Sequence, residues 1–150
     1  TDYSVWGASA GGHLAGSFGT TVMGYARYQL PKPGAIVLSY PVITLEKDLT
    51  HQGTRQNHIG KKADEKTARK YSVQTNVDAA YPPTYIWCGD ADGTVSPENT
   101  KMMEQALERN HIAHQCEIFP GVDHGVGPAT GTAAENWIEH AVTFWKENMR

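Results

Sequence analysis

The chain has little that would place it in a membrane or on a nucleic acid. No apolar run in its 150 residues approaches the ~18 residues of a membrane-spanning helix. Its 13 basic and 16 acidic residues give a net charge of −3, which favours neither a polyanion nor an anionic membrane as partner. We expect no nucleic-acid or membrane partner, and the apolar content of 39% is enough for the core of one domain.

Cysteine is equally scarce. Cys88 and Cys116 are the only two, and both lie in runs typical of strands, TYIWC and QCEIF. Two buried free thiols are the favoured interpretation, and a disulfide between neighbouring strands is the alternative. Two cysteines do not fix the cellular compartment, which stays unknown, with the cytoplasm favoured.

Glycine, by contrast, is abundant and gathers around one serine in GASAGGH, residues 7–13. The pattern Gly7-x-Ser9-x-Gly11 is that of a nucleophile elbow, where a strand turns sharply into a helix with the serine at its tip. We expect Ser9 to have a strained backbone with positive φ. We also expect that a Cβ at Gly7 or Gly11 would collide across the turn.

The rest of the chain alternates between strand-like and helix-like segments. Strands are predicted at 3–6, 35–40, 82–88 and 114–119, and helices at 10–25, 97–110 and 133–148. Such alternation predicts an α/β fold with a mostly parallel sheet flanked by helices. Right-handed crossovers between strands in sequential order would place the connecting helices on one face, leaving the other to the last helix.

Residues 46–80 interrupt this alternation. They contain 7 of the 13 basic residues and 5 acidic ones, with one plausible helix at 64–71. A long polar connection in a compact domain is typically a lid or a binding loop, and a solvated excursion without function is the alternative.

A nucleophilic serine needs a general base, and seven histidines compete for that role. His124 is the expected base, because it alone lies in a glycine-flanked loop, PGVDHGVG, directly after the last strand. His13 follows the elbow by one helical turn, and packing is its favoured role.

The base in turn needs an orienting carboxylate, and the loop after 82–88 reads GDADGTV. Asp92 is the expected acid, because Val95 can pack inward and aim it at the histidine; Asp90 is the alternative. A metal site formed by these carboxylates, Asp123 and His124 lacks the spacing of paired ligands, so neither metal nor cofactor is expected.

With these residues, the chain resembles the carboxyl-terminal half of an α/β hydrolase, most closely the acetyl-xylan-esterase-like and hormone-sensitive-lipase-like esterases. The matching segments are WGASAGGHLAG, LSYPVIT, PPTYIWCGDADGTVSPENT and EIFPGVDHGVG. The resemblance implies a serine esterase with Ser9 as nucleophile, His124 as base, Asp92 as its partner and the Ala10 backbone N–H as an oxyanion donor.

One feature of that family is missing from the chain. Family members have four strands and a His-Gly-Gly-type oxyanion loop before the elbow, whereas residue 1 here already adjoins the elbow strand. We therefore expect residues 1–150 to be the carboxyl-terminal portion of a single domain, inactive alone. The remainder would come from another segment or chain, or from a homo-oligomer.

The substrate is expected to be a small ester with a short acyl group, with an acetylated carbohydrate as the candidate. Trp87, Tyr40 and Tyr81 lie near predicted strand ends, where they could stack on a sugar, although core packing is the favoured role. The alternatives are a serine peptidase related to the prolyl oligopeptidases, and a non-catalytic binding module of the same fold.

Overall fold

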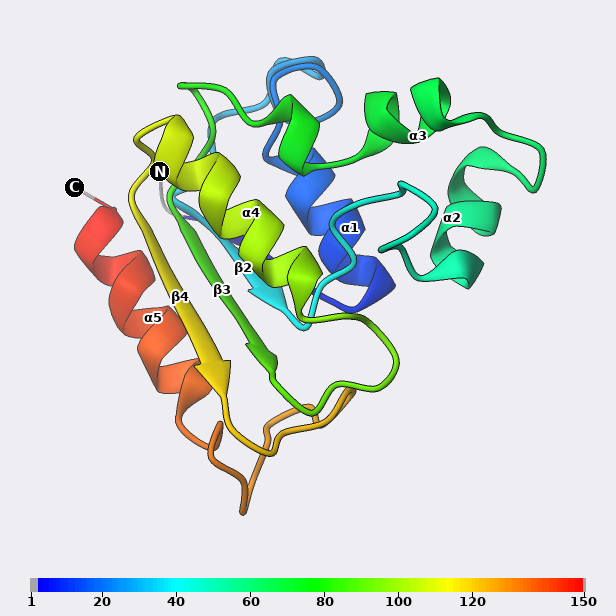
Figure 1. Cartoon of the computed structure of the whole chain (residues 1–150). Coiled ribbons are helices and arrows are strands. Elements are labelled where there is room, and N and C mark those ends of the chain that lie inside the picture. Colours follow the sequence, from blue (N-terminus) through cyan, green and yellow to red (C-terminus); the bar gives the residue numbers. More distant parts are fainter. Residues whose placement is uncertain (1–2, 150) are drawn as a thin grey trace.

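Helices and strands alternate along the computed structural model, which describes residues 3–149 (Figure 1). In chain order the elements are β1 (Ser4–Ala8), α1 (Ala10–Phe18), β2 (Ala35–Ser39), α2 (Gln52–Ile59), α3 (Glu65–Tyr71), the 3-10 turn η1 (Gln74–Asn76), β3 (Thr84–Gly89), α4 (Glu98–Arg109), β4 (His114–Phe119) and α5 (Trp137–Asn148).

The four strands form one parallel sheet in the order β1-β2-β3-β4, so the predicted parallel α/β sheet is confirmed. Every residue of β2 and β3 is buried, whereas β1 and β4 are only partly covered. This explains the unbroken apolar run AIVL in β2, since a central strand covered on both faces has no solvent side.

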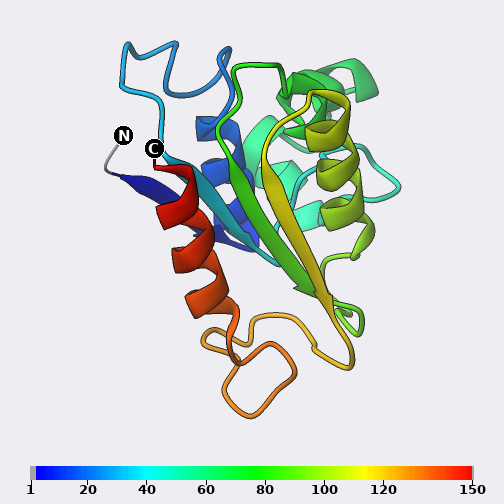
Figure 2. The ribbon, with the colours of Figure 1, turned by 90° about the vertical axis from the view of Figure 1, so that its left-hand side faces the viewer.

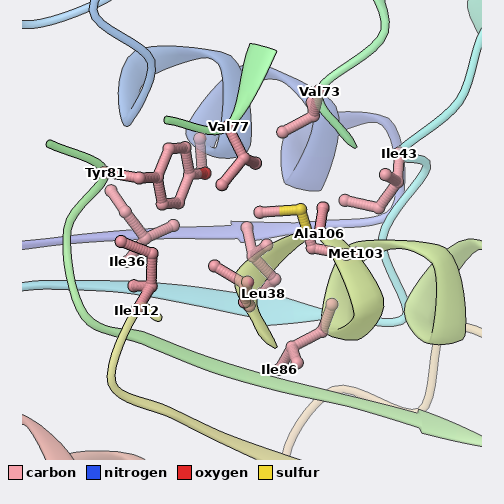
Figure 3. Close-up of a cluster of buried hydrophobic side chains, with 12 residues drawn as sticks. Ile36, Leu38, Ile43, Val73, Val77, Tyr81, Ile86, Met103, Ala106 and Ile112 are labelled. Atoms are coloured by element: carbon pink, nitrogen blue, oxygen red, sulfur yellow. The ribbon is translucent and has the colours of Figure 1, made fainter. Parts of the chain in front are cut away.

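Helices cover the sheet on both faces (Figure 2). Alternate residues of β2 divide between two clusters: Ile36 and Leu38 pack beneath α1 and α4, and Ala35 and Val37 pack against α5. Figure 3 shows the first cluster, in which Met103 of α4 lies among side chains from the strands. The predicted split, with connecting helices on one face and the last helix on the other, is confirmed.

Two helix boundaries differ from those predicted. Helix α1 ends at Phe18 rather than near residue 25, because the chain turns at Gly19, where a Cβ would lie 2.6 Å from the Tyr81 ring. Helix α5 begins at Trp137, since turns occupy the four preceding residues that had been assigned to it. The predicted strands agree with the observed ones within one or two residues.

The polar segment 46–80 contains the predicted helix α3 and also α2, a helix that the sequence pattern does not predict. Helix α2, QGTRQNHI, has little apolar periodicity. Tertiary contacts of the buried Arg55 hold it: the guanidinium donates to the Leu45 and Ala63 carbonyls and pairs with Glu65 at 2.9 Å.

Cys88 and Cys116 are both free, which confirms the favoured interpretation; Cys88 is buried and Cys116 partly so. Between residues 3 and 149, each helix is too short or too polar to span a lipid bilayer.

Candidate active site

Ser9 is the only residue between the end of β1 and the start of α1. Its backbone has φ 55° and ψ −122°, so the predicted positive φ is confirmed. Hydrogen bonds hold this conformation: the Ser9 N–H donates to the Ser39 carbonyl at 3.0 Å, and the Ser9 carbonyl accepts from Gly12 and Val42. A residue strained and held in this way has a fixed side-chain direction.

The glycines around Ser9 differ in how closely other atoms approach the position where a Cβ would lie. A Cβ at Gly7 would lie 2.1 Å from the Gly11 carbonyl oxygen, and one at Gly12 would lie 2.5 Å from Pro41. The prediction for Gly11 is wrong: apart from its chain neighbours and the backbone of its own helix, no atom of the described residues lies within 4 Å of its would-be Cβ. Gly11 is exposed, whereas Gly12 faces the segment after β2, so the close approach falls on Gly12.

Ser9, His124 and Asp92 lie in one chain of hydrogen bonds. Ser9 Oγ is 2.8 Å from His124 Nε2, and His124 Nδ1 is 2.8 Å from Asp92 Oδ2. Because a carboxylate only accepts, Nδ1 carries the proton, and the lone pair of Nε2 is free to accept the Ser9 hydroxyl. The three predicted residues therefore meet although 83 and 32 positions separate them in the sequence.

The Asp92 carboxylate is fixed by its own loop. Its Oδ1 accepts the backbone N–H groups of Thr94 and Val95, both at 2.9 Å, which leaves Oδ2 for His124. The carboxylate is fully buried, and Val95 packs inward as predicted. A carboxylate held by backbone donors is aimed without depending on another side chain.

Asp90 and Asp123, the other acids of this region, tie the two loops together. Asp90 accepts from the Gly121 N–H at 2.7 Å, and Asp123 accepts from the Gly93 N–H at 3.1 Å. The hydrogen bonds that Asp123 accepts, first from the His124 N–H, lower the pKa of its carboxyl. A carboxylate from each loop thus accepts from the backbone of the other loop, and of the three acids only Asp92 contacts the histidine ring.

The aromatic residues proposed as sugar platforms belong to the core. Trp87 and Tyr81 are almost fully buried, and Tyr40 is 7% exposed. The Tyr40 ring packs edge-on between His124, at 4.8 Å, and Trp87, at 5.1 Å. Tyr40 therefore packs against the imidazole ring, and the favoured core role of Trp87, Tyr40 and Tyr81 is confirmed.

His13 packs inside the molecule, as the sequence analysis favoured. Its Nε2 donates to the Tyr71 carbonyl at 2.8 Å, which ties α1 to the end of α3. Burial lowers the pKa of His13 to about 4. Its ring also contacts that of His58 in α2, with centroids 4.9 Å apart.

A cleft of about 420 Å³ opens beside the elbow, between α1 and α2. This volume is within the range of small-molecule sites. The cleft begins at Ala10, next to Ser9, and its far wall is formed by α2 and the residue that caps it. The residues lining it are Ala10, His13, Leu14, Ser17, His51, Gly53, Thr54, Asn57 and His58. The residues from α2 were missed because that helix was missed.

The backbone N–H of Ala10 lies in the first turn of α1, where N–H groups have no partner within the helix. The partial positive charge of a helix N-terminus is thereby next to Ser9 Oγ. An anionic oxygen formed beside Ser9 would meet both the N–H group and this charge.

This elbow, followed by an acid loop after β3 and a histidine loop after β4, defines an α/β hydrolase. Open parallel sheets bind ligands at the carboxyl ends of their strands. The arrowheads of β2, β3 and β4 in Figure 1 point to the end of the sheet where Ser9, Asp92 and His124 meet. Within this class, the chain belongs to the prolyl oligopeptidase family, whose model matches residues 2–150.

Its relatives include enzymes that are named for xylan and for acetyl esters. The chain is 29% identical over 133 residues to an acetylxylan esterase of Xylanibacter ruminicola, covering 86% of this chain and 27% of that protein. It is 28% identical over 139 residues to endo-1,4-beta-xylanase B of Butyrivibrio fibrisolvens, covering 89% of this chain and 22% of that protein.

Among solved structures, an acetyl ester-xyloside bifunctional hydrolase of Caldicellulosiruptor lactoaceticus superposes with a TM-score of 0.85 at 29% identity. The match covers 96% of this chain and 56% of that one. The chain therefore spans about half the length of this solved structure and about a quarter of the two relatives.

Proposed function

We propose that the protein is a serine esterase that removes short acyl groups, acetyl above all, from a carbohydrate. The observation that carries this proposal is the continuous hydrogen-bonded chain from Ser9 Oγ through His124 to Asp92. In this arrangement the hydroxyl can lose its proton to the imidazole as it attacks, and the imidazolium that forms lies against a buried carboxylate.

The reaction would run in two halves. Ser9 Oγ attacks the ester carbonyl while its proton passes to His124 Nε2, and the Ala10 N–H stabilises the oxyanion. The proton then passes to the leaving alcohol, and the acyl group stays on Ser9. Water, deprotonated by His124, attacks the acyl-enzyme and releases the acid, with Asp92 holding the imidazole throughout.

The cleft between α1 and α2 supports a carbohydrate as the alcohol part. Its α2 wall offers the Asn57 amide and the His58 ring to sugar hydroxyls, and Leu14 offers an apolar surface. The names of two relatives refer to acetyl groups and to xylan or a xyloside. A short acyl group on a xylose-containing oligosaccharide is thus the substrate class we assign.

Covalent labelling tests the chemistry directly. A fluorophosphonate should modify Ser9 in the full-length protein, and Ser9→Ala should abolish labelling, whereas Ser4→Ala, in the neighbouring strand, should leave it unchanged. Labelling that survives Ser9→Ala would place the nucleophile elsewhere.

The substrate class needs a second measurement. Asn57→Ala should raise KM for an acetylated xylo-oligosaccharide while leaving hydrolysis of p-nitrophenyl acetate, which has no sugar, unaffected. Equal effects on both substrates would refute the carbohydrate assignment but not the esterase.

Membership of the prolyl oligopeptidase family supports a second candidate, a serine peptidase using the same three residues. Cleavage of proline-containing peptide amides with no cleavage of acetyl esters would favour this candidate.

A further inference from the structure

Three potential metal ligands gather at the end of the sheet away from Ser9. Glu104 and Glu108 lie one turn apart on α4, and His114 is the first residue of β4. In Figure 1 this is where α4 leads into β4, opposite the strand arrowheads. The length of β4, at ~3.3 Å per residue, separates this group from the loop that carries His124.

The donor atoms of the three side chains converge. One carboxylate oxygen from each glutamate and one ring nitrogen of His114 all lie within 4.8 Å of one another. A tetrahedral metal with bonds of about 2.1 Å needs its ligand atoms about 3.4 Å apart. Rotation about the side-chain torsions of Glu104 and of the exposed Glu108 can bring the donor atoms from this spacing to the closer one that a metal needs.

The tautomer of His114 leaves one ring nitrogen free to bind a metal. His114 Nδ1 lies 2.8 Å from the Ile112 carbonyl oxygen, which can only accept, so Nδ1 carries the proton. The lone pair is therefore on Nε2. A histidine that donates one ring N–H to a backbone carbonyl and offers its other nitrogen is the usual arrangement at metal sites.

The two carboxylates are repelled by each other and have no counter-ion. Like charges four residues apart on a helix are destabilising. Neither glutamate takes part in any of the five ion pairs found among residues 3–149, and Lys101 on the same helix pairs with Glu98 at 2.7 Å. A divalent cation would remove this repulsion.

We propose that Glu104, Glu108 and His114 bind a divalent transition metal, with Zn²⁺ as the preferred ion. The bound metal joins the last turns of α4 to the start of β4. Imidazole together with carboxylates suits Zn²⁺ better than Mg²⁺ or Ca²⁺, which prefer oxygen ligands alone. Water would fill the fourth position. At this distance from Ser9, the metal stabilises the fold and takes no part in ester hydrolysis.

Thermal unfolding of the full-length protein, stripped with EDTA and then titrated with ZnCl₂, tests this site. We expect Zn²⁺ at saturation to raise the Tm by about 3 °C or more, because a ligand that binds only the folded state stabilises it. The isosteric double variant Glu104→Gln/Glu108→Gln should lose this rise. The matched control Glu135→Gln/Glu139→Gln, which removes two exposed glutamates that also lie four residues apart, should keep it.

Cobalt gives an independent readout. Co²⁺ bound by His114 and the two glutamates should produce visible absorption bands that disappear in His114→Ala and persist in His124→Ala. Two results would overturn the proposal: a Tm unaffected by Zn²⁺, or a rise of the same size in Glu104→Gln/Glu108→Gln. Activity is not the readout, because the proposed metal takes no part in ester hydrolysis.

Discussion

The position of the His124 ring is determined by contacts on three sides. Asp92 fixes Nδ1, Ser9 lies at Nε2, and the Tyr40 ring packs edge-on at 4.8 Å. Asp92 is in turn held by backbone N–H groups, which cannot rotate away as side chains can. In the proposed mechanism such rigidity would favour catalysis, because a general base contributes only when its lone pair is already aimed at the proton it accepts.

Asp92→Asn should therefore impair catalysis through the histidine tautomer. The amide can donate to Nδ1, which would move the ring proton to Nε2, where it opposes the Ser9 hydroxyl. We expect kcat for acetyl ester hydrolysis to fall by about 10⁴, with KM little changed. Ser9→Ala should lose the covalent route altogether, and Asp123→Asn should keep kcat within about 10-fold. If Asp123→Asn is as impaired as Asp92→Asn, the acid is misassigned.

Two neighbouring glycines of the elbow should respond in opposite ways. Gly12→Val would force side-chain atoms into Pro41, and overpacking of this kind costs about 1–3 kcal/mol or more. Gly11→Ala meets open space among the described residues and replaces a poor helix former, a gain of up to about 1 kcal/mol. Urea unfolding of the two variants compares them directly. A larger loss for Gly11→Ala than for Gly12→Val would mean that another part of the protein covers Gly11.

At the scale of elements, the sequence predicts what depends on local pattern. Strands such as AIVLS, which follows PKPG, are predicted nearly to the residue. The candidate site can be predicted from these strands, because Ser9, Asp92 and His124 lie in the loops that follow three of them. Helix α2 could not be predicted, because it depends on Arg55, whose partners come from other segments. The end of α1 likewise depends on Tyr81, 62 residues from Gly19.

The same limit applies to the residues of the candidate sites. The order Ser9, Asp92, His124 can be read from the chain, whereas the cleft wall exists only once α2 is placed against α1. In the sequence, nothing distinguishes Glu104 and Glu108 from other polar residues of a helix, or His114 from an ordinary first residue of a strand. Only the packing of α4 on β4 brings the three residues together.

The contact between α1 and α3 should make stability depend on pH. Burial lowers the pKa of His13 to about 4, below the ordinary 6.5. Between these values the unfolded chain binds a proton that the folded protein does not, so stability falls as the pH drops from about 6.5 towards 4. A shift of this size corresponds to about 3 kcal/mol.

Urea unfolding at pH 7.5 and pH 4.5 checks this prediction. His13→Gln, which has no titrating group, should lose less stability between the two pH values than the unmodified protein, even if it is less stable at pH 7.5. His111→Asn, at an exposed position, should behave as the unmodified protein does. Parallel pH curves for His13→Gln and the unmodified protein would contradict a buried neutral histidine.

The sheet ends in two edge strands, β1 and β4, and within residues 3–149 each pairs on one side only. The far edge, β4, adjoins the loop that carries His124, whereas α5 packs on the face formed by β2 and β3 (Figure 2). Within residues 3–149, β1 pairs only with β2, so its other side presents unpaired N–H and C=O groups. Beside this edge Trp6 is 39% exposed and Leu14 72%, around an apolar hollow of about 550 Å³.

We propose that residues 1–150 form the carboxyl-terminal portion of one α/β-hydrolase domain, with residues 46–80 as its polar insertion, and that a further strand of that domain pairs with β1. This chain covers 56% of the solved relative, so the rest of that relative is long enough to contain such strands. They would cover the apolar hollow beside Trp6 and bring a second oxyanion donor to the elbow.

Expression of residues 1–150 alone, compared with the full-length protein, tests this proposal. The unpaired β1 edge and the apolar surface beside it should make the short form self-associate in sedimentation experiments. Loss of one oxyanion donor costs about 10²–10³ in rate, so kcat/KM for an acetyl ester should fall at least that far. Trp6→Lys, which places a charge beside the edge, should reduce the association without restoring activity. A monodisperse 16.4 kDa monomer with the turnover of the full-length protein would show that β1 needs no further strand.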